Sequence, residues 1–162
     1  MYSPDIWKIL NKMSKFEPKI PINETNKNLK IGIIMPYFNE HIGLKLYVKI
    51  LETLTENGIK KTNIKLIRVP GALEIPFAAL QMAKSKKFDS IIAIGAVIKG
   101  KTDHYYNVSK ESYRGLMDIS LKYEIPIING ILTVNKEKQA LKRIKNGESY
   151  AKSAIFMASL KN

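Results

Sequence analysis

The sequence predicts one α/β domain, in which helices cover both faces of a four-stranded parallel sheet. Short apolar segments alternate with longer amphipathic ones from residue 29 to residue 160. The short segments are almost continuously hydrophobic, as is typical of strands buried on both faces of a parallel sheet. Alternating strands and helices favour right-handed crossovers between parallel strands. A length of 162 residues also suits a single domain.

Four segments are predicted to be strands. Each is rich in isoleucine, valine or leucine, and glycine, proline or asparagine stands near its ends. The segments are LKIGIIM at residues 29–35, IKLIRV at 64–69, SIIAIGAVI at 90–98 and EIPIINGILTV at 124–134.

Five segments are predicted to be helices. In the first, Ile42, Leu46 and Ile50 recur on one helix face, and Asn57-Gly58 closes the segment. Pro76 stands in the first turn of the second helix, where the absence of its backbone N–H loses no hydrogen bond of the helix. The expected helices cover residues 41–57, 75–85, 104–123, 136–144 and 148–160.

Residues 1–28 are predicted to form an N-terminal extension, and residues 29–162 the domain. The extension is polar and proline-interrupted, with a short helix expected near residues 6–13. Residues 19–23, KIPIN, are expected to form an extended arm, because Pro21 permits an edge strand but not a central one. The extension lacks a long apolar core and a small-residue cleavage site, so it does not indicate a secretory signal.

The composition excludes several classes of function. The chain has no cysteine, which excludes disulfides, thiolate metal sites and cysteine nucleophiles and suits the cytoplasm. A net charge of +13 would attract nucleic acid, but the lysines are spread along the chain and no nucleic-acid motif accompanies them. No apolar run approaches the ~20 residues of a membrane span. We therefore expect neither a nucleic-acid partner nor a membrane partner.

The unusual segments of the chain follow the predicted strands. Ligands of an open parallel sheet bind beyond the carboxyl ends of its strands, where helix N-termini point N–H groups toward them. We therefore expect four segments to converge on one rim: Pro36–Asn39, Pro70–Glu74, Lys99–His104 and Asn129–Thr133.

The third of these segments predicts a phosphate site beside a proton transfer. Gly100 allows a tight turn, Lys101 and Thr102 offer donors at a helix start, and His104 titrates near neutral pH. Residues 95–102 also match the G-x-x-x-x-G-K-[ST] pattern of a P-loop. However, the residues between the glycines continue an apolar strand, so a nucleoside-triphosphate site is disfavoured.

Four motifs together resemble the 6,7-dimethyl-8-ribityllumazine synthase family. They are VPGALEIPFAA, GAVIKGKTDHYYNV, NGILTV and QALKR, in the family's order. The resemblance implies a flavodoxin-like α/β/α sandwich with an N-terminal arm strand that joins a neighbouring subunit's sheet. It also implies a transferase of riboflavin biosynthesis that uses no metal and no organic cofactor. Its substrates would be 5-amino-6-ribitylaminouracil and 3,4-dihydroxy-2-butanone 4-phosphate, and its assembly a homopentamer or a sixty-chain shell.

The resemblance also implies roles for individual residues. Phe38 would stack on the pyrimidine with Asn39 beside it, and His104 would shuttle protons. Contacts to the pyrimidine or its ribityl chain are implied for Ala72, Leu73, Glu74, Ala96, Val97 and Ile98. The butanone phosphate would be held by Lys101, Thr102 and Arg143. The residue reaching in from an adjacent subunit would be Asn129.

Simpler explanations remain for these residues when each is judged alone. Phe38 could be a loop aromatic that packs against the protein, and Glu74 a carboxylate in the first turn of a helix, where the helix dipole favours it. His104 and Arg143 could each lie on a solvated surface. The other histidine, His41, belongs to no motif and is expected at the surface. The family's usual residues are also replaced at four positions, now Tyr37, Lys99, Asn107 and Lys142, and the segment from Arg143 to Gly147 is shortened. A non-catalytic member that binds a flavin-like ligand or builds a shell is therefore the alternative.

Overall fold

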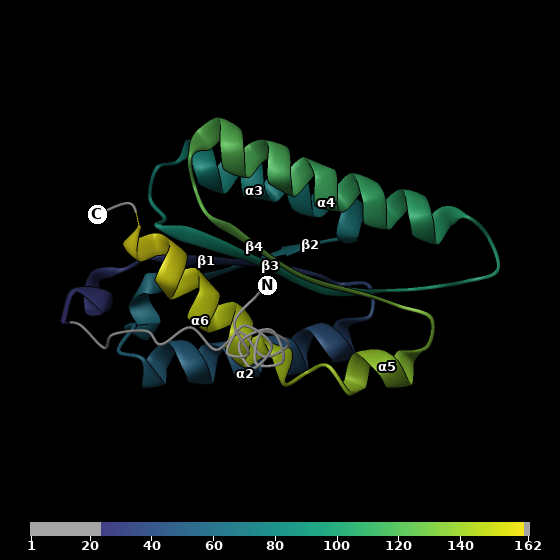
Figure 1. Cartoon of the computed structure of the whole chain (residues 1–162), viewed down its shortest axis with the longest axis horizontal. Coiled ribbons are helices and arrows are strands. Elements are labelled where there is room, and N and C mark those ends of the chain that lie inside the picture. Colours follow the sequence, from purple (N-terminus) through teal and green to yellow (C-terminus); the bar gives the residue numbers. More distant parts are fainter. Residues whose placement is uncertain (1–23, 161–162) are drawn as a thin grey trace, which may run out of the picture.

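The computed structural model describes residues 24–160, which form a three-layer α/β/α sandwich (Figure 1). All four strands are parallel, in the spatial order β2-β1-β3-β4. They are β1 (Ile31–Pro36), β2 (Ile64–Val69), β3 (Ser90–Ile98) and β4 (Ile127–Val134). The predicted fold class is confirmed. The helix expected near residues 6–13 and the arm at 19–23 lie outside the described residues.

Helices cover both faces of the sheet (Figure 1). One face carries α2 (Glu40–Glu56), α5 (Glu137–Leu141) and α6 (Asn146–Ser159), and the other carries α3 (Ile75–Lys84) and α4 (His104–Tyr123). Three short 3₁₀ turns complete the described chain: η1 (Glu24–Asn28), η2 (Lys61–Asn63) and η3 (Ala72–Glu74). Among these described helices, none has the length and apolar character needed to span a membrane.

The central strands are buried on both sides, which explains their continuous hydrophobicity. In β1, Ile33 belongs to the core beneath α2 and α6, while the next residue, Ile34, belongs to the core beneath α3 and α4. Both side chains are fully buried. Successive side chains of a strand point to opposite faces, so one short strand supplies both cores.

Most predicted boundaries lie within about two residues of the observed ones, and the C-terminal third differs most. Strand β4 begins three residues later than expected, because Glu124 adopts a left-handed conformation (φ 51°) that ends α4. The helix expected at 136–144 ends at Leu141. A turn follows it, in which Arg143 N–H donates to Ala140 O at 2.8 Å.

One predicted loop is wrong, because Asn129–Thr133 do not follow the fourth strand but lie within it. Asn129 pairs with Ala93, near the amino end of β4. Gly130 does not break the strand, since its bare Cα makes room for a neighbouring ring. A Cβ at Gly130 would lie 2.7 Å from Cδ2 of Tyr150. Only three of the four expected segments therefore form loops at the carboxyl edge of the sheet, namely those after β1, β2 and β3.

Candidate active site

A cavity of about 480 Å³ lies at the carboxyl ends of β1 and β3. Its size falls within the range of small-molecule sites. The loops after β1, β2 and β3 and the first turns of α4 supply its walls. The lining residues are Pro36, Phe38, Asn39, Gly71, Ala72, Leu73, Glu74, Ala96, Val97, Ile98, Gly100, Thr102, His104, Tyr105 and Val108.

The turn between β1 and α2 presents Phe38 to this cavity. Its backbone is fixed on one side, because Phe38 N–H donates to Pro70 O at 3.2 Å. It is fixed on the other by Asn39, whose Nδ2 donates to Ala96 O at 2.8 Å. Asn39 has a left-handed backbone (φ 55°), which asparagine tolerates better than most residues. The Phe38 side chain itself is 73% exposed, so the turn holds an aromatic ring at the cavity with its face free.

The end of β3 forms the cavity wall. Gly95 has φ 153°, and a Cβ on it would lie 2.9 Å from Cγ of Pro36. A glycine here allows β1 and β3 to approach each other closely. Ala96, Val97 and Ile98 continue β3 rather than wrapping around a ligand. The disfavoured P-loop interpretation is therefore excluded by the backbone itself, since a P-loop needs a glycine-rich turn at this place.

The 3₁₀ turn η3 is held to α4 by a buried hydroxyl. Ser112 is fully buried, and its Oγ lies 3.1 Å from Ala72 O and 2.6 Å from Val108 O. The single hydroxyl proton is shared between these two carbonyl oxygens. The contact fixes Ala72 while Leu73 and Glu74, on the same turn, stay exposed at the cavity.

The loop between β3 and α4 places polar groups at the start of a helix. His104 is the first residue of α4, and its N–H donates to Thr102 Oγ1 at 3.4 Å. Lys99 Nζ donates to the Tyr106 hydroxyl at 3.0 Å, and this bond raises the pKa of Lys99 above its usual value. The loop thus combines an imidazole, a hydroxyl and a fully protonated ammonium group beside a helix N-terminus.

The structure brings most of the predicted site residues together. Those that line the cavity are Phe38, Asn39, Ala72, Leu73, Glu74, Ala96, Val97, Ile98, Thr102 and His104. Five further residues line the cavity: Pro36, Gly71, Gly100, Tyr105 and Val108. Sequence reasoning expected Gly100 at the site and placed Pro36 and Gly71 in segments of the rim, but it missed Tyr105 and Val108. Tyr105 directly follows His104, and Val108 lies one helical turn after His104, so helical spacing could have indicated Val108.

Three predicted residues do not line the cavity of their own chain. Lys101 is exposed in the loop before α4, although both of its neighbours line the cavity. Arg143 lies in the turn between α5 and α6, exposed, with Nη1 donating to Gln139 O at 3.1 Å. Asn129 is exposed on β4, which is an edge strand.

The free edge of β4 is partly satisfied by its own surroundings. Asn129 Oδ1 accepts a hydrogen bond from Ile131 N–H at 3.1 Å. The Tyr113 hydroxyl donates to Ile131 O at 2.6 Å. Partial burial raises the pKa of Tyr113, so this hydroxyl remains a donor at neutral pH.

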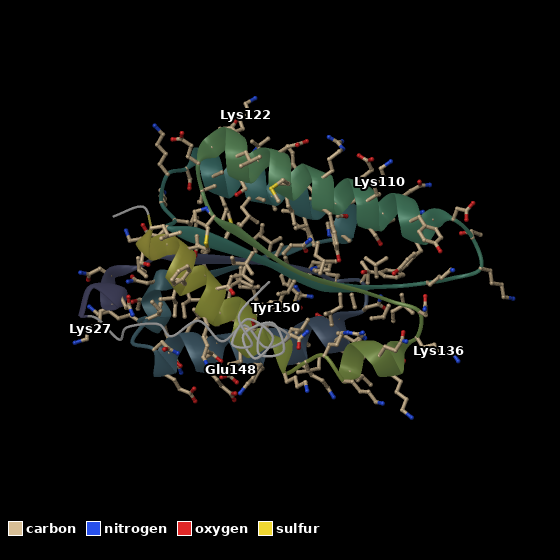
Figure 2. All side chains as sticks on the ribbon, viewed as in Figure 1. Lys27, Lys110, Lys122, Lys136, Glu148 and Tyr150 are labelled. Atoms are coloured by element: carbon tan, nitrogen blue, oxygen red, sulfur yellow. The ribbon has the colours of Figure 1, made fainter. Side chains whose placement is uncertain are left out.

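Charge elsewhere on the molecule is dispersed. Lys110 and Lys122 project from α4, whereas Lys136 lies just before α5 (Figure 2). His41 is exposed, as expected, and pairs with Glu137. Within residues 24–160, no cluster of three or more His, Asp or Glu side chains could hold a metal ion.

The cavity has apolar walls and contains the imidazole of His104, the hydroxyl of Thr102 and the carboxylate of Glu74. It lies at the carboxyl edge of a parallel sheet. These features are typical of an α/β enzyme that acts on small molecules. The family model described as 6,7-dimethyl-8-ribityllumazine synthase matches residues 28–162, and the chain belongs to this family. It is 44% identical over 141 residues to proteins of that name from Neisseria meningitidis serogroup C and serogroup B. Each alignment covers 86% of this chain and 89% of the relative. The resemblance noted from the motifs is confirmed.

Proposed function

We propose that the protein condenses 5-amino-6-ribitylaminouracil with 3,4-dihydroxy-2-butanone 4-phosphate to 6,7-dimethyl-8-ribityllumazine, as a transferase of cytoplasmic riboflavin biosynthesis. The reaction releases phosphate and water. One observation carries the proposal: in a chain of this family, the residues of two separate family motifs and of the turn after β1 line a single cavity. The domain that performs the reaction is residues 29–162, and residues 1–28 are an extension that carries the arm.

The pyrimidine binds against the exposed ring of Phe38. An aromatic side chain with a free face gains by stacking on a planar heterocycle. The ring edge then lies along the main chain of Ala96, Val97 and Ile98, and the ribityl chain extends toward Ala72, Leu73 and Glu74. In this placement the hydroxyls of the ribityl group contact the carboxylate of Glu74, and the flat pyrimidine ring contacts the apolar wall.

The butanone phosphate binds at the start of α4. The N-terminus of a helix attracts anions through its free N–H groups and its dipole. Thr102 supplies a hydroxyl there and Lys101 a positive charge, and Arg143 can bind phosphate oxygens in a bidentate manner.

Catalysis then depends on proximity and on one proton-transfer group. The 5-amino group of the pyrimidine attacks the ketone carbonyl of the butanone phosphate, and loss of water gives an imine. Phosphate leaves next, and the ribitylamino nitrogen closes the second ring with loss of a further water. His104 is placed to move protons in these steps, while fixing the two substrates together supplies much of the rate.

Arg143 and Asn129 lie outside their own chain's cavity, which supports a site shared between subunits. We propose a homopentamer in which each chain's Arg143 and Asn129 complete the neighbour's cavity. In this pentamer, the arm at residues 19–23 joins an adjacent sheet. Twelve such pentamers could close into a sixty-chain shell, although the net charge of +13 per chain opposes this at low salt.

The direct test is to incubate the pure protein with both substrates and follow lumazine absorbance and fluorescence. We expect product to form without added metal or cofactor, with phosphate released in equal amount. An assembled protein that forms no product under any condition would contradict this activity and leave the alternative, a non-catalytic ligand-binding or shell-forming member of the family.

His104→Ala is expected to slow turnover by roughly ten- to a hundredfold without abolishing it, because one proton-transfer group is lost while substrate positioning survives. Steady-state kinetics with both substrates checks this result. His41→Ala is the matched control, since His41 is the other histidine and does not line the cavity. Complete inactivity of His104→Ala with normal ligand binding would contradict the proposed role.

A further inference from the structure

Arg68, the fifth residue of β2, makes four contacts with the segment that carries Phe38. Its Nε donates to Met35 O at 3.3 Å, and its Nη2 donates to Pro36 O at 3.5 Å. The same Nη2 forms an ion pair with Glu40 Oε1 at 2.7 Å. The guanidinium carbon also lies 4.1 Å from the centre of the Tyr37 ring, a cation–π contact. One side chain therefore touches residues before and after Phe38.

The position of the Phe38 ring depends on this turn alone. With 73% of its surface exposed, the ring has little packing of its own to hold it in place. The segment must therefore be fixed through its backbone and its neighbours. Arg68 is well suited to this, since its side chain is only 21% exposed and it does not itself line the cavity.

We infer that Arg68 is a positioning residue for the pyrimidine, acting through the turn that presents Phe38. This inference depends on the proposed stacking role of Phe38. Arg68 does not itself line the cavity, and its contacts are with the segment around Phe38 rather than with the loop that offers donors to phosphate. Its loss should therefore weaken use of the pyrimidine and leave use of the butanone phosphate unchanged.

The arrangement requires the shape of arginine as well as its charge. A guanidinium is planar, so it can stack on Tyr37 while its edge donates to backbone carbonyls and to Glu40. A lysine ammonium is a point charge with no flat face. Arg68→Lys can keep the ion pair with Glu40 but cannot reproduce the whole set of contacts.

The test measures KM for each substrate, and kcat, in Arg68→Gln and Arg68→Lys. We expect Arg68→Gln to raise the pyrimidine KM by about tenfold, because small displacements of a positioning group have large effects. For Arg68→Lys we expect a partial rise of about threefold. In both variants kcat and the KM for butanone phosphate should stay within about twofold of wild type. The thermal midpoint of Arg68→Lys should stay close to that of wild type.

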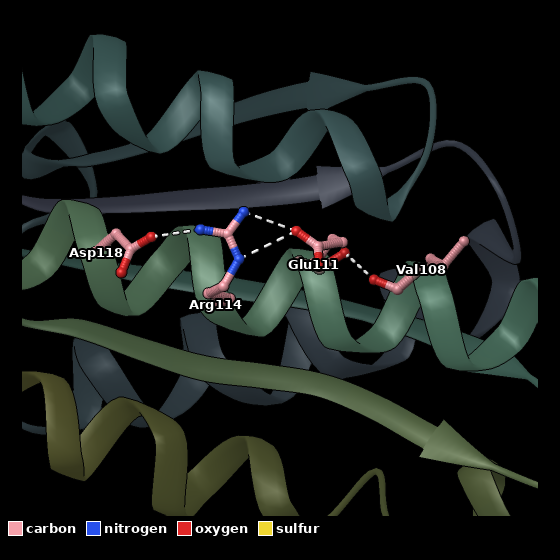
Figure 3. A network of polar contacts seen from close by, with 5 residues as sticks. Val108, Glu111, Arg114 and Asp118 are labelled. Atoms are coloured by element: carbon pink, nitrogen blue, oxygen red, sulfur yellow. Dashed lines mark hydrogen bonds and ion pairs between the residues drawn. The ribbon is translucent and has the colours of Figure 1, made fainter.

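Arg114→Gln is the matched control for loss of an arginine. Arg114 lies on α4 and pairs with Glu111 at 2.7 Å and Asp118 at 2.8 Å, away from the β1–α2 turn (Figure 3). Its side chain is 61% exposed and does not line the cavity. We expect its pyrimidine KM to equal that of wild type. An equal rise in Arg114→Gln and Arg68→Gln would show a general effect of charge and would overturn the inference.

Phe38→Ala separates this inference from the proposed function. If Phe38→Ala raises the pyrimidine KM but Arg68→Gln does not, only the role of Arg68 is overturned. If Phe38→Ala leaves the pyrimidine KM unchanged, the stacking role is wrong and the inference about Arg68 falls with it. Equal rises in KM for both substrates in Arg68→Gln would also overturn the inference, because a selective effect on the pyrimidine is its central claim.

Discussion

Gly95→Ala is expected to lower the free energy of unfolding by about 3 kcal/mol, from backbone strain and overpacking together. The backbone at Gly95 has φ 153°, a region that residues with a Cβ rarely adopt. The new methyl would also lie 2.9 Å from Cγ of Pro36, whose ring is rigid. Both strands that the change pushes apart line the cavity, so activity should fall with stability. Urea unfolding at fixed protein concentration measures the loss.

Gly100→Ala is the stability control for Gly95→Ala. A Cβ at Gly100 would meet no atom within 4 Å, and its φ lies outside the region that favours glycine. We expect its unfolding free energy to stay within about 0.5 kcal/mol of wild type. A Gly95→Ala protein that unfolds at the same urea concentration as wild type would show that β1 and β3 can separate without cost, against the close contact described here.

Mixing two inactive variants is expected to restore activity if the site is shared. Phe38→Asp places a charge where the pyrimidine stacks, and Arg143→Ala removes a phosphate ligand, so each pure variant should lose about a hundredfold or more. In an equal mixture, an active site needs an intact Phe38 on one chain and an intact Arg143 on the next. Half of the chains meet each condition, so about a quarter of the sites should recover in a head-to-tail ring.

The mixture is prepared by coexpression, and turnover per chain is compared with wild type. Light scattering at moderate ionic strength gives the mass alongside, near five chains for the pentamer and near sixty for the shell. Wild-type Phe38 and Arg143 never occur on the same chain in the mixture, so no recovery is expected if each active site takes both residues from one chain. No recovery in a mixed oligomer, or a stable active monomer, would refute the shared site.

Patterns within a single element predicted the fold well. Strand β3 and helix α4 begin and end at the predicted residues. In β3 the hydrophobic run coincides with burial on both faces, and in α4 the apolar spacing coincides with one inward-facing stripe. Local sequence is sufficient for such elements, because each one's pattern directly reflects the surface against which it packs.

Features that depend on distant residues were predicted less well. The segment Asn129–Thr133 was expected beyond the end of a strand, but Tyr150 from α6 fills the space above Gly130 and the strand continues. The role of Arg143 stays a prediction, because the residue does not line its own chain's cavity and sequence order cannot show whether it enters that of a neighbouring chain. Arg68 carried no motif at all, since its contacts with Pro36 and Glu40 exist only once β1 and β2 are paired.

The hydrogen bonds at Ile131 have a consequence for solubility. Exposed strand edges are templates onto which other chains can add, and such growth leads to fibrous aggregates. On the outer edge of β4, the amide and the carbonyl of Ile131 are already occupied by Asn129 and Tyr113. A stray strand would have to break both bonds before it could extend the sheet past this point. These two hydrogen bonds thus protect the β4 edge against the uncontrolled addition of strands from other chains.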